Sequence, residues 1–238
     1  MLALAGCVQP SLAPNINAAT ARVLDRLGIE LFEEKKAGCC GAVRHHLNDQ
    51  AAARADVRRN IDAWWPHVEA GVEAIVVTAS GCGVQVRDYG HLLADDADYA
   101  AKAARVSALC RDPSEVVAAE AAALDKLLVP AERGKLAFHS PCTLQHGLKI
   151  RGVVEGLLTR AGFRLQPVVD AHLCCGSAGT YSVLQAEISG QLRERKLNAL
   201  NASAPDCVAT ANIGCLTHLK AGSALPVRHW IELMDEAT

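Results

Sequence analysis

The cysteines of this 238-residue chain form two copies of one pattern. In each copy a single cysteine is followed 32 positions later by an adjacent pair, and the pair is followed 42 or 40 positions later by a last cysteine. The first copy consists of Cys7, Cys39, Cys40 and Cys82, and the second of Cys142, Cys174, Cys175 and Cys215. Because the copies are offset by about 135 residues, the chain is predicted to be an internal duplication.

The two copies also share an order of predicted secondary structure. Short apolar runs at residues 2–5 and 135–139 predict buried strands. Apolar residues at helical spacing predict helices over 15–28 and 150–162. The other expected elements are strands at 29–33, 163–168, 74–79 and 208–211, and helices at 50–70 and 183–201. This alternation predicts an α/β fold of two tandem similar units, each with a mainly parallel sheet flanked by helices.

The repeat also sets the expected domain limits. We expect a first cysteine-rich unit at residues 1–110, a helical connection at 111–134 and a second unit at 135–238. The alanine-rich segment 95–128 has helical character throughout, and it is interpreted as the joint between the two units.

The position of the cysteines relative to the strands predicts where they gather. The outer cysteines of each copy follow predicted strands, and ligands of open α/β sheets bind beyond the carboxyl ends of strands. The adjacent pairs follow the second strand of each unit and can reach the same edge. Gly41 and Gly176 let the backbone turn beside a bulky group. Four thiolates per unit are therefore expected to converge on one point.

A set of four thiolates suits either zinc or an iron–sulfur cluster. Structural zinc sites usually contain ligands paired as C-x₂₋₄-C, and this chain has no C-x-x-C. Adjacent cysteines suit a larger group, because their side chains can diverge to different iron atoms. The spacing favours an iron–sulfur cluster, with zinc as the alternative.

The remaining two cysteines and several histidines have a weaker claim to a role. Cys110 and Cys207 have no counterpart in the other copy and are interpreted as packing residues. The histidines that flank the two sets are interpreted as hydrogen-bonding neighbours or surface residues: His45, His46, His139, His146 and His172. Thr143, Ser177 and the amide of Asn212 are candidates for hydrogen bonds to cluster sulfurs.

Composition argues against several other classes of protein. The net charge is −2 and aromatic residues make up 4%, so we expect neither nucleic-acid binding nor attraction to a membrane surface. No dinucleotide-binding glycine motif, P-loop or G-x-S-x-G is present. The apolar runs are strand-sized, and the start of the chain lacks the pattern of a signal peptide. We expect a cytoplasmic protein whose clustered cysteines serve metal or redox chemistry rather than disulfides.

The chain resembles the cysteine-rich CCG domain, which occurs in heterodisulfide reductases and in iron–sulfur subunits of respiratory dehydrogenases. It is most similar to the C-terminal part of the glycolate oxidase (glycolate dehydrogenase) iron–sulfur subunit. The stretches that carry the resemblance are GCVQPSLAPNINAATARVLDRLGI, AGCCGAV, NIDAWWP, TASGCG, PCTLQHG, HLCCGSAGTYS, TANIGC and VRHWIELM. They span the chain from end to end.

The resemblance implies an electron-transfer subunit with one or two 4Fe–4S clusters. In that family, FAD lies on a partner flavoprotein that oxidises glycolate to glyoxylate, and electrons pass to a quinone or membrane acceptor. The chain would belong to an oxidoreductase complex without acting on the substrate itself. It would lie in the cytoplasm or, through its partners, peripherally at the inner face of the membrane.

Two departures from the family pattern bear on these expectations. The fullest family pattern ends each repeat in C-x-x-C, whereas this chain has Ala79 and Asn212 at the first position of that ending. This departure argues against heterodisulfide cleavage chemistry. The ferredoxin-like domain that normally begins the glycolate oxidase subunit is also missing from this sequence, so we expect a truncated or split version.

Other readings of the residues remain open. The chain could be a structural bridging module whose cysteine sites hold zinc or nothing. It could also be the equivalent subunit of a lactate, glycerol-3-phosphate or heterodisulfide reductase system. Its own residues do not identify the hydroxy acid, because the substrate would bind to the partner.

Overall fold

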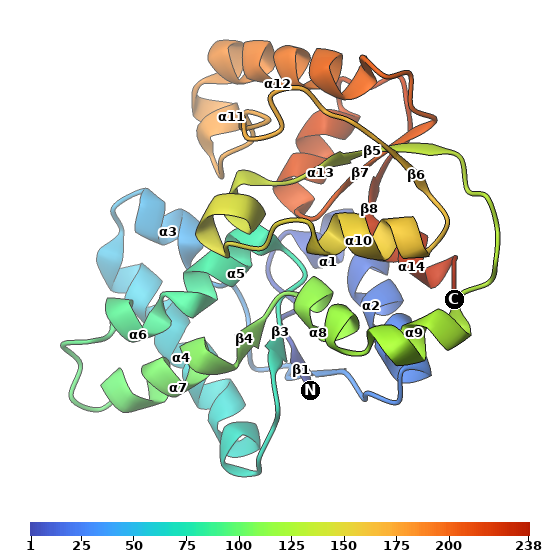
Figure 1. The fold of residues 1–238 in the computed structure, drawn as a ribbon. Helices are drawn as coiled ribbons and strands as arrows, with labels where there is room; N and C mark the ends of the chain where they lie inside the picture. Colours follow the sequence, from blue (N-terminus) through green and yellow to red (C-terminus); the bar gives the residue numbers. More distant parts are fainter. The chain divides into compact units, whose positions relative to one another are not determined.

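The computed structural model describes all residues 1–238, which divide into two compact units, residues 1–116 and 117–238. Each unit contains a four-stranded parallel sheet flanked by helices (Figure 1). The predicted α/β fold with two duplicated units is confirmed. No helix combines the length and the apolar character needed to cross a lipid bilayer.

The sheets of the two units have the same strand order. In the first unit the order is β2-β1-β3-β4, and in the second it is β6-β5-β7-β8. The strands of the first unit are β1 (Leu2–Ala3), β2 (Phe32–Glu33), β3 (Ile75–Val76) and β4 (Cys110–Arg111). Those of the second are β5 (Lys135–His139), β6 (Arg164–Gln166), β7 (Cys207–Thr210) and β8 (Val227–His229). All neighbouring strands run parallel.

Helices connect the strands in each unit. The first unit contains α1 (Gln9–Leu12), α2 (Asn15–Arg26), α3 (Ala42–His46), α4 (Gln50–Glu69), α5 (Ser80–Arg87), α6 (Tyr89–Leu92) and α7 (Ala100–Leu109). Helix α8 (Pro113–Ala119) crosses the limit between the units. The second contains α9 (Ala121–Leu127), the π-helical turn η1 (Thr143–Gly147), α10 (Val153–Arg160), α11 (Tyr181–Leu184), α12 (Ala186–Asn201), α13 (Ile213–Lys220) and α14 (Trp230–Asp235).

Each unit has its own apolar core. In the first unit, Ile61 and Trp64 of α4 are fully buried in a cluster that includes Ile75 of β3. In the second unit, Trp230 of α14 and Leu136 of β5 are fully buried. The spacing of apolar residues along α2 and α10 is the pattern that predicted both helices, because it places their apolar sides against the core.

The fourth strand of each sheet was not predicted. Strand β4, which includes Cys110, lies in the alanine-rich segment 95–128 that was interpreted as helical in character. Strand β8 has only three residues, and its middle residue is the charged Arg228, so it does not have the apolar character of a predicted buried strand. Strands this short carry too few residues to show a period of two, so only their pairing with β3 and β7 identifies them.

The buried central strand generates a stability prediction. We expect Ile75→Ala to lower the free energy of unfolding by about 2–5 kcal/mol, because it removes buried methyl and methylene groups and leaves a cavity. Leu12→Ala is the control, since Leu12 in the same unit is 60% exposed, and its effect should stay within about 0.5 kcal/mol. Urea unfolding followed by circular dichroism measures both. Equal effects would contradict the placement of β3 in the core.

Candidate metal centres

The strand order of each sheet creates one topological switch point at its carboxyl edge. The chain passes from β1 to β2 on one side and then crosses to β3 on the other side of β1. Ligands of parallel sheets bind at such a point, where neighbouring connections leave in opposite directions. Cys7 follows β1, and Cys82 is the third residue of α5, directly after β3. The outer cysteines of the first copy therefore lie at the expected edge.

The second unit repeats this placement. Cys142 follows β5 at the start of η1, and Cys215 is the third residue of α13, which follows β7. The chain crosses β5 in the same way, from β6 on one side to β7 on the other. The switch point of the second sheet thus also lies between its two cysteine-bearing connections.

The adjacent cysteines sit in a loop that only glycine can close. Gly41 and Gly176, which directly follow the two pairs, have φ of +87° and +95°. A Cβ at Gly41 would lie 3.2 Å from the carbonyl oxygen of Ala53 in α4, and one at Gly176 only 2.6 Å from that of Ser189 in α12. The loop is thus held tightly against the long helix of its unit.

The structure brings the four predicted thiols of the first copy together. The thiol of Cys39 lies within hydrogen-bonding reach of Cys7 on one side and Cys40 on the other, and Cys40 reaches Cys82. Cys40 is buried, whereas Cys7 is exposed. The four sulfur atoms therefore form a continuous row that is exposed at Cys7, buried at Cys40 and half-buried at Cys39 and Cys82.

The four thiols of the second copy form the same row. Cys174 reaches both Cys142 and Cys175, and Cys175 reaches Cys215. Cys175 and Cys215 are buried. Each row contains four thiols that can ligate a metal, and all ten cysteines of the chain are free of disulfide bonds.

Mutual hydrogen bonding gives each row one stabilised thiolate. Hydrogen bonds from Cys40 and then Cys7 lower the pKa of Cys39 to about 2, and the bond to Cys39 raises the pKa of Cys7 and of Cys40. The backbone N–H of Gly41 also donates to the Cys39 sulfur at 3.5 Å. Metals bind deprotonated thiols, so loading of such a row releases the protons of the flanking cysteines.

The second row has the same electrostatics. Hydrogen bonds from Cys142 and then Cys175 lower the pKa of Cys174 to about 2, and the pKa values of both neighbours are raised. The N–H of Gly176 donates to the Cys174 sulfur at 3.3 Å. The first cysteine of each adjacent pair is thus the favoured site of negative charge in both units.

Two polar residues clamp the loop of the first unit. The side-chain amide of Asn60 donates to the carbonyl of Cys39 at 2.8 Å, and its oxygen accepts from the N–H of Gly38 at 2.8 Å. The hydroxyl of Tyr89 donates to the carbonyl of Cys40 at 3.0 Å. Sequence analysis missed both residues. The available signal was the position of Asn60, which falls at helical spacing among apolar residues of the predicted helix at 50–70 and is fully buried in the structure.

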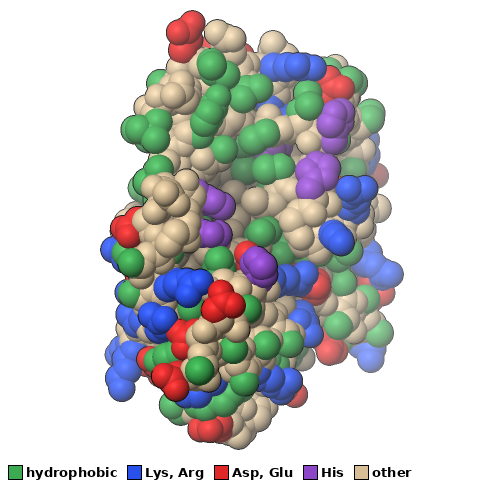
Figure 2. Space-filling view, turned by 90° about the vertical axis from the view of Figure 1, so that its left-hand side faces the viewer, with side chains coloured by type: hydrophobic (Ala, Val, Ile, Leu, Met, Phe, Trp, Pro, Cys, Tyr) green, Lys and Arg blue, Asp and Glu red, His purple; other side chains and the backbone are tan.

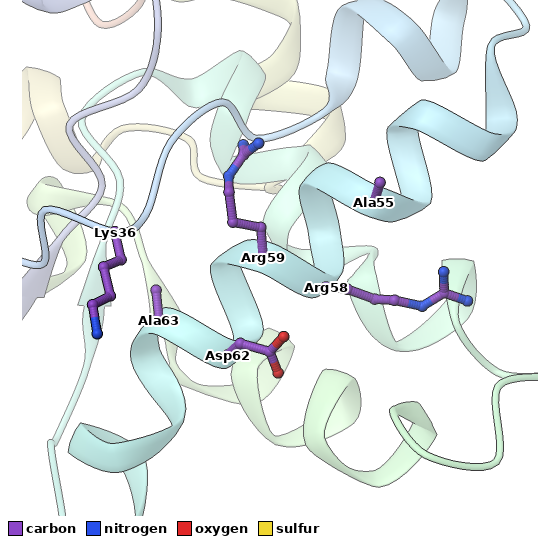
Figure 3. A pocket seen from close by; sticks show the side chains of 6 residues that line it. All are labelled: Lys36, Ala55, Arg58, Arg59, Asp62 and Ala63. Carbon is purple, nitrogen blue, oxygen red and sulfur yellow. The ribbon is translucent and has the colours of Figure 1, made fainter.

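A depression on the surface of α4 lies beside this loop (Figure 3). It is lined by Lys36, Ala55, Arg58, Arg59, Asp62 and Ala63. Arg58 pairs with Asp96 at 2.8 Å, and Arg59 pairs with Asp56 at 2.8 Å and donates to the Cys39 carbonyl at 3.4 Å. Both arginines are thus paired with carboxylates of the same chain, and Arg59 also stabilises the loop that carries Cys39.

Different residues surround the row of the second unit. Lys196 of α12 is 2% exposed, and its ammonium group donates to the carbonyl of Asp170 at 2.8 Å and to that of Ala171 at 3.4 Å. Burial lowers the pKa of Lys196. The Asn212 amide donates to the Cys215 sulfur at 3.5 Å, a contact of the kind suggested by the sequence. Lys196 was missed, because a buried lysine and an exposed lysine of a predicted helix cannot be told apart from the sequence.

His139 lies much closer to the second row than the sequence suggested. One of its ring nitrogens and the sulfur atoms of Cys175 and Cys215 all lie within 4.8 Å of one another. Its Nδ1 is 2.9 Å from the hydroxyl oxygen of Thr210. Burial lowers the pKa of His139 to about 3, so the ring is neutral at neutral pH.

The other four histidines named from the sequence bond elsewhere. His45 Nδ1 lies 3.4 Å from the side-chain oxygen of Gln85, and His46 stacks on His45 with ring centroids 5.6 Å apart. His146 Nε2 lies 3.3 Å from the carbonyl of His172. None of these four belongs to a group of side chains placed to share a metal ion.

Cys110 and Cys207 lie outside the two rows, on strands β4 and β7. The Cys110 thiol donates to the Gly83 carbonyl at 3.7 Å, and burial raises the pKa of Cys110 to about 12. The Cys207 thiol donates to the Pro226 carbonyl at 3.3 Å. Both thiols therefore contact backbone carbonyls instead of the thiols of a row, which is consistent with their interpretation as packing residues.

The surface shown in Figure 2 is mixed in character. Basic and acidic side chains are interspersed over its lower part, and hydrophobic side chains gather at the top. Helices α11 and α12 contribute Val183, Leu184 and Ile188, which are 78%, 64% and 50% exposed. This face shows no field of a single sign such as nucleic-acid binding requires.

The closed loop of the second unit generates a stability prediction. We expect Gly176→Ala to lower the free energy of unfolding by about 1–3 kcal/mol, because a left-handed backbone and a close carbonyl both oppose a Cβ. Gly190→Ala in α12 is the matched control. A Cβ there meets nothing within 4 Å, and the change should raise stability by about 0.5–1 kcal/mol. Urea unfolding that ranks the two variants equally would contradict the close packing of the loop.

Comparison with known proteins gives one family and several relatives. The family described as a cysteine-rich domain, CCG, matches residues 1–87 and 136–220, one match in each unit. The glycolate oxidase iron–sulfur subunit of Escherichia coli (strain K12) is 54% identical over 237 residues, which is 100% of this chain and 58% of that protein. The probable glycolate oxidase iron–sulfur subunit of Bacillus subtilis (strain 168) is 28% identical, over 91% of this chain and 48% of that protein.

A third relative matches this chain over nearly its whole length. Lactate utilization protein A of an Exiguobacterium species (strain ATCC BAA-1283 / AT1b) is 26% identical over 97% of this chain and 94% of that protein. The chain thus spans about half of the two glycolate oxidase relatives and almost all of the lactate utilization relative. With a match in each of its two units and the paired cysteines of each match in one row, the chain belongs to the CCG cysteine-rich domain family.

Proposed function

We propose that this chain is the iron–sulfur electron-transfer part of a flavin-dependent 2-hydroxy-acid dehydrogenase, with glycolate as the substrate of the complex. The observation that carries the proposal is the duplicated row of four thiols, present in a chain 54% identical to a glycolate oxidase iron–sulfur subunit. The proposed ligands are Cys7, Cys39, Cys40 and Cys82 in the first unit, and Cys142, Cys174, Cys175 and Cys215 in the second.

The residues of each row fit an iron–sulfur cluster. Four cysteine thiolates are the usual ligands of a 4Fe–4S cluster, and each row offers four in contact. Such a cluster accepts and releases one electron at a time. Zinc also binds four thiolates, so a zinc site is the outcome against which the proposal is tested.

The surrounding residues have defined tasks in this proposal. The N–H groups of Gly41 and Gly176 donate to the first sulfur of each pair, and the amide of Asn212 donates to the Cys215 sulfur. Hydrogen bonds to cysteine sulfurs raise the reduction potential of a cluster that they ligate. Burial of Cys40 and Cys175 keeps water away from these two sulfur atoms. The chain thereby sets the potential while the flavin carries out the substrate chemistry.

The partners of this chain are proposed from the family resemblance of its sequence. A flavoprotein that carries FAD would deliver the electrons, and a quinone or another membrane acceptor would receive them. A ferredoxin-like domain on the same or another chain would complete the route. With these partners, the complex would lie in the cytoplasm or at the inner face of the membrane.

A second candidate function is favoured by one observation. This chain matches 94% of the length of lactate utilization protein A, so a protein of similar length carries that name. The proposed chemistry of the cysteine rows is the same in both cases, because the hydroxy acid would bind to the partner. Purification of the flavoprotein that associates with the chain, and assay of glycolate against lactate, separates the two.

Loss of either row generates a prediction on metal content. After anaerobic purification, Cys39→Ser/Cys40→Ser and Cys174→Ser/Cys175→Ser should each retain about half of the iron and acid-labile sulfide of the parent chain. Cys207→Ser is the control and should retain all of it, since that thiol bonds to a backbone carbonyl. Zinc in place of iron, or unchanged iron in both double variants, would contradict the proposed ligands.

Electron transfer in the assembled complex generates a separate prediction. Cys39→Ser and Cys174→Ser should each lower hydroxy-acid-dependent reduction of a quinone analogue by about tenfold or more, because each removes a proposed cluster ligand that contacts two other thiols of its row. Direct reduction of a dye by the flavoprotein should be unchanged. If quinone reduction survives both substitutions, the chain is a structural bridge and not an electron carrier.

A further inference from the structure

The two units differ at one buried position near the end of their first strand. Leu4 follows β1 and is 3% exposed, and the residue 135 positions later is His139 of β5, which is 2% exposed. The facing residue of the neighbouring strand differs as well. Thr210 of β7 pairs with His139 in register, and Val77 takes its place in the first unit. A leucine–valine pair in one unit is thus a histidine–threonine pair in the other.

Only one of the two ring nitrogens of His139 has a hydrogen-bond partner in the protein. Nδ1 faces the hydroxyl of Thr210 at 2.9 Å, whereas Nε2 is buried and has no hydrogen-bond partner. A buried polar atom without a partner is unfavourable, and native proteins rarely leave one unexplained. Nothing in the apolar packing of the first unit calls for a polar residue at this position, since Leu4 fills it there.

The surroundings of His139 indicate what the partner is. A ring nitrogen and the sulfur atoms of Cys175 and Cys215 lie within 4.8 Å of one another. Nε2 makes no hydrogen bond to either thiol, so the protein leaves the space between them unbridged. Metal–nitrogen and metal–sulfur bonds of about 2.0 and 2.3 Å span a separation of that order. The contact of Nδ1 with Thr210 orients the ring, as is usual for histidines that ligate metals.

We propose that His139 is a direct ligand, through Nε2, of an iron atom bound at the second cysteine set, beside Cys175 and Cys215 and in addition to the four cysteine sulfurs, so that one iron of this set has two protein ligands. The second centre is then a mixed nitrogen–sulfur site, and the first is ligated by sulfur alone. This inference rests on the proposed function, since it requires iron in the second row. Histidine ligation raises the potential of an iron–sulfur centre. The two centres of the chain therefore differ in potential, with the second one higher.

The test uses the full chain with the first row removed by Cys39→Ser/Cys40→Ser, so that the signal comes from the second row. Protein grown with ¹⁴N- or ¹⁵N-histidine is purified anaerobically, reduced and examined by pulsed electron paramagnetic resonance. We expect a strong nitrogen coupling that changes with the isotope. His139→Leu, which installs the residue found in the first unit, should abolish this coupling and lower the midpoint potential. His146→Leu is the control for an exposed histidine and should change neither.

The outcomes separate this inference from the function on which it rests. A chain that binds no iron and no sulfide contradicts the proposed function and this inference together. Iron bound in the second row with no strong histidine coupling, or with a coupling that survives His139→Leu, contradicts this inference alone. The isotope comparison needs no substitution at His139, so it decides the matter even if His139→Leu does not fold.

Discussion

The parallel order of strands in each sheet is the constraint on which both candidate centres depend. Since the chain crosses from β2 over β1 to β3, the connections after β1 and β3 leave the sheet side by side and bring Cys7 to Cys82. The loop that carries Cys39 and Cys40 then only has to reach that point. A left-handed glycine lets it do so, by allowing the backbone to lie directly against α4.

The duplication has kept the row of sulfur atoms and changed its support. Asn60 and Tyr89 hold the loop carbonyls in the first unit, whereas the buried ammonium group of Lys196 holds backbone carbonyls beside the loop in the second. Leu4 and His139, which occupy equivalent buried positions, are a further difference between the surroundings of the two rows. A shared set of four cysteines with different neighbours is a means of giving two similar centres different potentials, because hydrogen bonds, charge and burial all affect a metal bound to thiolates.

Much of the fold was accessible from sequence, and the misses have a common cause. The apolar spacing in 15–28 and 150–162 predicted α2 and α10 because each helix buries one side. Strands β4 and β8 were missed, since two or three residues show no periodicity and exist as strands only through pairing with a neighbour. The candidate ligands were found because cysteine is distinctive and its spacing repeats. Lys196 and Tyr89 were not, because such residues are common on helices.

The sequence by itself determined the duplication, the α/β class and the two sets of four cysteines, since these are properties of residue type and spacing along the chain. Only the tertiary structure decided which thiols contact one another in each row, and which buried polar groups surround each row. The physical reason is distance along the chain. His139 meets Thr210 71 residues later, and Tyr89 meets Cys40 49 residues earlier, so folding alone creates these contacts.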